Sequence, residues 1–174
     1  MKIPAGLRGV MSAFPFTGTV AWIGVRPAPR VAIQVLEHVE AISGRGLQGD
    51  RAAEISRPGN DRQVTLIQAE HLVAMAALLR RESIDPALLR RNIVVDGLNL
   101  ASLKGHAFRV GDAILEMTGD CHPCSLMELQ LGTGGYNAMR GHGGITARVI
   151  AGGTICVGAL VEALPAEVDV ANAT

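Results

Sequence analysis

The sequence predicts a mainly β domain of the α+β class, in which a closed or partly open β-barrel carries a few peripheral helices. Three observations predict this fold. Short segments rich in β-branched residues alternate with turns, many of them built from the chain's 21 glycines. One segment alone has a long helical repeat of apolar residues. The 174 residues contain no internal repeat or linker, and this length fits one domain with a sizeable core.

We expect three parts along the chain. Residues 1–16 contain two prolines and two glycines and predict an N-terminal arm or a loose first strand. Residues 17–164 hold the barrel domain. Residues 165–174 predict a C-terminal tail that frays.

The first strands lie directly after the arm. Residues 17–25 are β-rich and end at a turn with two prolines over residues 26–29. Residues 30–41 alternate apolar and polar side chains, so they predict a second strand that forms a hairpin with the first. The glycine-rich residues 43–51 predict a tight loop, which continues over residues 52–61.

The middle of the chain combines two strands with the clearest helix. Residues 63–67 predict a strand, and residues 68–82 predict a helix with one apolar stripe. The stripe consists of Leu72, Met75, Ala76 and Leu79. Asp85-Pro86 predicts an N-cap and the first turn of a short helix that ends near residue 90. Residues 91–95 predict another strand.

The last third of the chain predicts further strands around a short helix. Residues 107–110 and 113–117 predict a hairpin around Gly111-Asp112. The remaining elements are, in order, a helical turn or two over 124–129, a loop over 131–136, a strand over 143–150 and a strand over 154–162. Cys156 lies between apolar neighbours and is expected to be a small buried residue.

Composition excludes several classes of protein. The net charge is zero and aromatic residues make up 3% of the chain, so we expect no nucleic-acid partner and no anionic membrane surface. The longest apolar run, residues 72–79, is far shorter than the ~20 residues that span a bilayer. Pro4, Gly6 and Gly9 interrupt any signal-peptide core. Three cysteines cannot all pair, so we expect reduced thiols and a cytoplasmic protein.

The segment from Gly119 to Ser125 carries the richest chemistry. It places Cys121, His122 and Cys124 between a predicted strand and a predicted helix, where free backbone N–H groups and the helix dipole favour a thiolate. A single Cys-x-x-Cys pair has several interpretations. A zinc site would need further ligands, such as other histidines, and a redox pair would need a βαβ context.

Five segments, in order, resemble the MOSC domain, the family named for the C-terminal domain of molybdenum cofactor sulfurases. The segments are Gly46-Leu47-Gln48-Gly49-Asp50-Arg51, Arg62-Gln63-Val64-Thr65-Leu66, Arg91-Asn92-Ile93, Pro123-Cys124 and Gly143-Gly144-Ile145-Thr146-Ala147-Arg148-Val149. The resemblance extends from about residue 18 to residue 163. No segment is specific alone, and the glycine-Asp-Arg loop and the Pro-Cys step are the most telling.

The resemblance implies a β-barrel that binds a molybdenum cofactor of the molybdopterin type. It implies that Cys124 ligates the molybdenum or carries a persulfide. It also implies reduction of N-hydroxylated compounds to amines, with electrons from a separate reductase. Sulfurase fusions hold pyridoxal phosphate in another domain, so pyridoxal phosphate is not expected in this chain. Its two lysines are Lys2 and Lys104, and neither lies in a Schiff-base motif.

A pterin phosphate needs arginine side chains and backbone N–H groups. The candidates are Arg51, Arg62, Arg91, Arg140 and Arg148, with the loops over residues 46–49 and 141–144, which include Gly49, Gly143 and Gly144. Asp50 would orient Arg51 or a loop amide. Asn92 would bind the pterin or cap a turn. His122 would donate a proton during N–O reduction or be a solvated loop residue.

Three functions stay open at this point. The first is a molybdenum-dependent oxidoreductase that acts on N-hydroxylated substrates with a separate electron donor. The second is a carrier that uses Cys124 to deliver sulfur or the molybdenum cofactor to another protein. The third is a structural thiol or zinc module. The sequence leaves a homodimer open.

Overall fold

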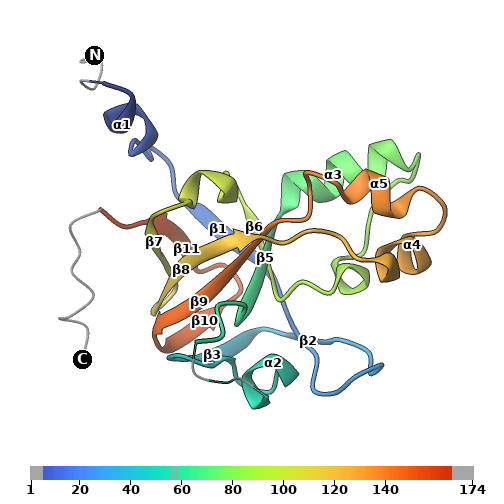
Figure 1. The fold of residues 1–174 in the computed structure, drawn as a ribbon, viewed down its shortest axis with the longest axis horizontal. Helices are drawn as coiled ribbons and strands as arrows, with labels where there is room; N and C mark the ends of the chain where they lie inside the picture. The colour runs from blue at the N-terminus through green and yellow to red at the C-terminus, as the bar shows by residue number, and fades with distance from the viewer. Residues whose placement is uncertain (1–5, 56, 58, 166–174) are drawn as a thin grey trace.

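The computed structural model describes residues 6–55, 57 and 59–165, and its centre is a closed β-barrel of seven strands (Figure 1). Around the barrel the strands are β1 (Gly18–Val25), β6 (Ile93–Asp96), β5 (Val64–Gln68), β9 (Ile145–Ala151), β8 (Ala113–Asp120), β7 (Ala107–Val110) and β11 (Leu160–Ala163). Pairing of Gly18 with Val161 closes the ring. Neighbouring strands run antiparallel, except that β5 and β6 run parallel. The predicted barrel with few helices is confirmed.

A smaller sheet lies beside the barrel and contains β10 (Gly153–Cys156), β3 (His38–Ile42) and β4 (Gly46–Leu47). The predicted single strand over residues 30–41 is therefore wrong. Its last residues form β3, and a three-residue strand, β2 (Gln34–Leu36), pairs with the end of β1. The predicted strand over residues 154–162 is likewise two strands, β10 and β11, separated by a turn with a left-handed Gly158.

The strands of the barrel bury two different faces. Leu66 of β5 and Val95 of β6 point into the barrel, where they join a cluster that includes Phe108 and Leu115. Their neighbours Ile67 and Val94 point outward and pack beneath the helices. Because both faces of β5 and β6 are covered, adjacent residues in each strand are apolar, as in Leu66-Ile67 and Val94-Val95.

Three helices and one 3₁₀ turn cover the outer face of β5 and β6. They are α3 (Ala69–Leu78), α4 (Ser125–Leu131), α5 (Gly135–Met139) and η1 (Pro86–Leu89), and Figure 1 shows α3, α4 and α5 together on one side of the barrel. The predicted long helix is confirmed, although it ends at Leu78. The short helix after Asp85 is also confirmed, and the Asp85 side chain accepts a hydrogen bond from Ala87 N.

Two predicted loops contain short helices. The helix α5 begins at Gly135, inside the predicted loop over residues 131–136, because a residue without Cβ can approach Leu131 closely there. The helix α2 (Arg51–Glu54) forms inside the predicted loop over residues 52–61, because Asp50 caps it. Another 3₁₀ turn, η2 (Leu100–Leu103), precedes β7.

The predicted N-terminal arm contains a helix, α1 (Gly6–Met11), which projects from the barrel in Figure 1. Residues 1–5 of the arm lie outside the described residues. So does the predicted tail, apart from Pro165. Among the residues that the structure describes, no helix has the length and apolar character that a membrane span requires.

We predict that Gly144→Ala destabilises the protein, because Gly144 has φ of +82° and a Cβ there would lie 2.0 Å from Leu66 O. The expected loss in free energy of unfolding is roughly 2–4 kcal/mol, from backbone strain and overlap together. Urea denaturation measures it. Gly105→Ala is the matched control, since Gly105 has φ of +80° but nothing within 4 Å of a Cβ. Equal losses for the two variants would contradict this packing.

Candidate functional site

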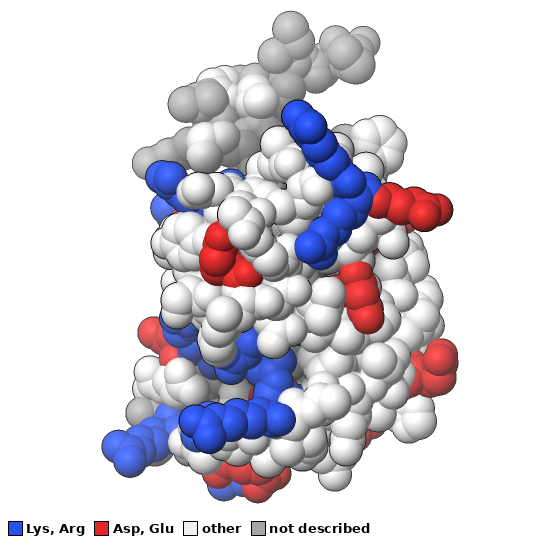
Figure 2. Space-filling model, turned by 90° about the vertical axis from the view of Figure 1, so that its right-hand side faces the viewer, with Lys and Arg blue, Asp and Glu red and all other residues white. Residues whose placement is uncertain are grey.

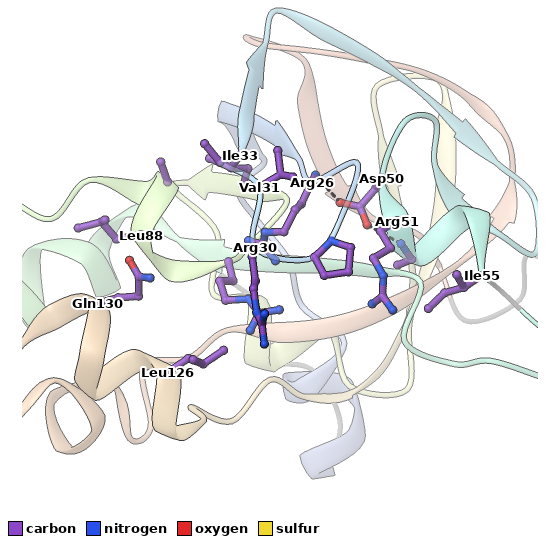
Figure 3. A pocket seen from close by; sticks show the side chains of 15 residues that line it. Arg26, Arg30, Val31, Ile33, Asp50, Arg51, Ile55, Leu88, Leu126 and Gln130 are labelled. Atoms are coloured by element: carbon purple, nitrogen blue, oxygen red, sulfur yellow. Dashed lines mark hydrogen bonds between the residues drawn. The ribbon is translucent and has the colours of Figure 1, made fainter.

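A pocket of about 840 Å³ lies between the β1–β2 loop, α2 and α4, and four arginines line it. We call it the arginine pocket, after Arg26, Arg30, Arg51 and Arg90. On the face shown in Figure 2, basic side chains gather around a hollow in the lower half of the molecule. In Figure 3, Leu126 and Gln130 of α4 lie on the opposite side of the pocket from Ile55.

Local backbone structure brings the four arginines together from three distant segments. Arg26 and Arg30 lie in the loop after β1, and Arg51 begins α2. Arg90 ends η1 in a left-handed conformation with φ of 57°. Arg30 is left-handed as well, with φ of 62°. Left-handed backbone is rare outside glycine and is concentrated at functional sites, which supports a functional role for this pocket.

Asp50 fixes the loop that carries Arg51. The carboxylate is 7% exposed and caps α2 by accepting a hydrogen bond from Ala52 N at 2.8 Å. Its other oxygen accepts bonds from Arg26 N and from Asn92 Nδ2, each at 2.9 Å. Of the two roles expected for Asp50, the structure thus has it holding loop amides.

Asn92 ties this loop to the barrel. Its Nδ2 donates to Asp50 and to Gly24 O, and its Oδ1 accepts from both the backbone and the hydroxyl of Thr65. Every hydrogen-bonding position of the amide group faces β1, β5 or the Asp50 loop. The side chain therefore supports the pocket from behind.

The arginine pocket has an excess of positive charge. Asp50 is the one acidic residue among those that line it, against four guanidinium groups. Burial lowers the pKa of Arg26, and the charge of Arg90 lowers it further, while Asp50 opposes the shift. With four guanidinium groups against one carboxylate, the pocket favours an anionic ligand.

The cysteine segment connects β8 to α4, and the predicted strand-to-helix junction is confirmed. Cys124 is the N-cap residue of α4 and is exposed. Cys121 is 3% exposed, and its N–H donates to Gly144 O at 2.9 Å. Because Leu126 lines the arginine pocket, Cys124 lies next to that pocket along the chain. Among the described residues, no three His, Cys, Asp or Glu side chains are grouped so as to hold a metal ion.

Arg91 holds this segment in place. The guanidinium is buried and donates to Gly143 O at 2.7 Å, to Cys121 O at 2.9 Å and to Leu89 O at 3.0 Å. Burial lowers the pKa of Arg91, and the nearby Cys121 and Cys124 oppose that shift. Arg62 also contacts the cysteine segment, with its Nη2 at 3.9 Å from Cys121 Sγ.

A second pocket, of about 290 Å³, lies against Cys121, His122 and Pro123. Two residues expected to cradle a phosphate, Gly143 and Gly144, line this pocket instead of the arginine pocket. Their lack of side chains has a structural reason. A Cβ on Gly143 would lie 2.1 Å from Cys121 O, so glycine lets this loop pack directly onto the cysteine segment.

The structure divides the expected site residues between the two pockets and the cysteine segment, and it adds others. Asp50 and Arg51 line the arginine pocket, Gly49 directly precedes them, and Asn92 contacts Asp50. Arg148 lies elsewhere and pairs with Glu116 at 2.7 Å. Sequence reasoning missed Arg26, Arg30 and Arg90. The signals available were the arginines that flank the two prolines after β1 and the doubled arginine before Asn92.

One expectation about the thiols is wrong. Cys156 is exposed and not buried, because it is the last residue of β10, where the chain leaves the smaller sheet. Cys156 lines neither pocket.

We predict that Arg91→Lys loosens the cysteine segment. Lysine cannot reach all three carbonyls, and each buried carbonyl left unpaired costs about 1–3 kcal/mol. In the wild type, iodoacetamide should modify the exposed Cys124 and Cys156 and leave Cys121 untouched; in the variant, Cys121 should also react. Peptide mass spectrometry measures the labelling. Arg148→Lys is the control, because its exposed pair contributes about 0–1 kcal/mol. Protection of Cys121 in both variants would contradict this role for Arg91.

Comparisons with solved structures support the barrel fold. The chain is similar to the YuaD protein of Bacillus subtilis, with a TM-score of 0.71 and 20% identity over 85% of this chain and 96% of that chain. It is also similar to YiiM of Escherichia coli, with a TM-score of 0.65 and 21% identity over 87% of this chain and 71% of that chain. YiiM of Geobacillus stearothermophilus gives a TM-score of 0.66 and 19% identity, over 88% and 78% of the two chains.

These identities are low, so the likeness to solved structures concerns the fold alone. No curated protein matches the chain. A family model described as the MOSC domain matches residues 55–162, which contain the cysteine segment, Arg91 and Asn92. The match covers more than half of the chain, and the chain therefore belongs to the MOSC domain family.

Proposed function

We propose that the protein binds a molybdenum cofactor of the molybdopterin type and reduces N-hydroxylated compounds to amines. The observation that carries the proposal is the arginine pocket, which four guanidinium groups and one carboxylate line and whose wall includes Leu126, two residues after the exposed Cys124. Family membership supports the same proposal, because MOSC proteins are associated with this cofactor.

The residues present fit such a cofactor. Its terminal phosphate would bind the arginine pocket, whose planar guanidinium groups suit phosphate oxygens. The volume of about 840 Å³ lies within the range of roughly 300–1,000 Å³ that is usual for ligand pockets. Cys124 would hold the metal, since a thiolate is a soft ligand and the pterin would add two sulfur atoms. Arg148 would not bind the cofactor, because its guanidinium forms ion pairs with Glu116 and Asp61.

Other residues act indirectly in this proposal. Asp50 and Asn92 hold the loop that begins at Gly49 in position for Arg51. Arg91, Gly143 and Gly144 fix the backbone of Cys121, and Arg62 lies against its sulfur. The Cys121 side chain is buried, which leaves Cys124 as the accessible thiol of the segment.

The reaction requires a second protein. Reduction breaks the N–O bond, consumes two electrons and two protons, and releases the oxygen as water. When bound, the cofactor would supply two-electron transfer to that bond. A separate reductase would provide the electrons. His122, which is exposed at the second pocket, would give a proton to the departing hydroxyl.

A second candidate function is sulfur or cofactor delivery. The exposure of Cys124 favours it, because a partner protein could reach a persulfide on this sulfur. A carrier would hold transferable sulfur on Cys124 and would not turn over N-hydroxylated compounds. The experiment below separates the two functions.

We predict that protein made in a host that synthesises molybdopterin contains molybdenum and reduces an amidoxime when a chemical electron donor is supplied. Cys124→Ser should lower bound molybdenum or turnover at least about tenfold, because a hydroxyl is a poor substitute for a soft thiolate ligand. Elemental mass spectrometry measures the metal.

The control for this substitution is Cys156→Ser, which changes an exposed thiol at the end of β10, outside the cysteine segment. Its molybdenum content and turnover should match those of the wild type. Wild-type protein without molybdenum and pterin would rule out the oxidoreductase. Sulfane sulfur that is lost with Cys124 would then identify the carrier.

We predict that Arg30→Ala weakens retention of the cofactor through its phosphate. A hydrogen bond to a charged group contributes roughly 1.5–3 kcal/mol, so pterin content after dialysis should fall about tenfold or more. Fluorescence of the oxidised pterin measures it. Arg109→Ala is the control, because Arg109 is a half-buried arginine that pairs with Glu162 on the barrel. Equal retention by the two variants would argue against a phosphate site in the arginine pocket.

A further inference from the structure

We infer that the second pocket binds a small ligand that carries no negative charge and accepts a hydrogen bond from Gln68. Resting on the proposed function, we further infer that the N-hydroxylated substrate binds there. The pocket lies against the cysteine segment through Cys121, His122 and Pro123. The arginine pocket includes Leu126, two residues beyond Cys124. Along the chain, Cys124 thus lies between the walls of the two pockets.

Gln68 supplies a donor that the protein itself leaves unused. The side chain is 8% exposed and lines the pocket. Its Oε1 accepts a bond from Leu100 N at 3.1 Å, which fixes the amide so that Nε2 is the free end. No described residue accepts a hydrogen bond from that Nε2. That Nε2 is a donor on a largely buried side chain, and an acceptor atom of a ligand in the pocket would complete its hydrogen bonding.

The imidazole of His71 is a second polar group on the wall of this pocket. His71 lines the pocket and packs edge-on against His142, with ring centroids 5.2 Å apart. Burial lowers the pKa of His71, and His142 lowers it further, so the ring is uncharged at neutral pH. The Nδ1 atom of His71 is buried and has no hydrogen-bond partner. Leu100, Ala101 and Ile145 add apolar surface to the wall, alongside the polar Asp120 and His122.

The two pockets therefore differ in the ligand charge that they favour. No lysine or arginine lines the second pocket, and Asp120 stands among its lining residues. The nearby cation, Arg91, is turned away, because its donors bind the carbonyls of Leu89, Cys121 and Gly143. An anion would find no lysine or arginine on this wall and would share the pocket with the Asp120 carboxylate. A neutral amidoxime, and the amidinium cation formed by its reduction, would meet the Gln68 amide and the Asp120 carboxylate.

The test is equilibrium binding of benzamidoxime and benzoate to the full chain, measured by isothermal titration calorimetry. The two probes share a ring and differ in charge. Ala101→Phe fills the pocket from an exposed position and keeps the backbone N–H that Asn99 caps. Ser102→Phe adds the same ring one residue later, outside the pocket. Thermal melting confirms that both variants fold.

We expect benzamidoxime to bind the wild type and Ser102→Phe equally. Ala101→Phe should bind it at least about tenfold more weakly, a difference of roughly 1.4 kcal/mol, and benzoate should bind the wild type more weakly by a similar factor. Three results would overturn the inference: no saturable binding at millimolar benzamidoxime, equal binding by both variants, or benzoate binding as tight as benzamidoxime binding.

Molybdenum content and turnover, measured on the same preparations, separate this inference from the proposed function. If the protein contains no molybdenum but Ala101→Phe still weakens benzamidoxime binding, the pocket assignment is supported and the oxidoreductase function is ruled out. If Ala101→Phe turns over the substrate with an unchanged KM, the oxidoreductase function is supported and its substrate binds elsewhere.

Discussion

The site depends on one buried cation. Arg91 directs its donors at carbonyls of Leu89, Cys121 and Gly143, which belong to three segments far apart in the sequence. Taking a guanidinium out of water is costly, and only well-aligned hydrogen bonds offset that cost. The cation therefore stays buried only while those three segments converge. Their convergence forms one wall of the second pocket and sets where the chain enters α4 with Cys124 at its start.

Three consecutive residues divide the work of the site between them. Arg90 extends into the arginine pocket, Arg91 is buried against the cysteine segment, and Asn92 binds Asp50 behind the pocket. The left-handed turn at Arg90 makes this possible, because it changes the direction of the chain just before β6 begins. The same short stretch of backbone thus positions both pockets. A displacement of that stretch would move the anion site and the cysteine segment together.

The sequence predicts the barrel well, because alternation and glycine turns report directly on strands with one buried face. It predicts the long helix because the apolar residues there recur at helical spacing. It fails where tertiary contacts decide. The short helices α2 and α5 exist through the Asp50 cap and the close approach of Gly135 to Leu131, neither of which has a periodic signal. Asp50, Arg51 and Cys124 could be singled out by motif. Arg26, Arg30 and Arg90 could not be grouped, because only the folded chain brings their segments to one pocket.

The left-handed backbone at Arg30 and Arg90 has a consequence for how the protein balances stability against affinity. A side chain in that conformation costs roughly 1–2 kcal/mol that glycine would avoid, yet the chain carries arginine at both places. The fold therefore gives up stability before any ligand arrives. In return, two long side chains begin from fixed positions, and a ligand loses less affinity to ordering them.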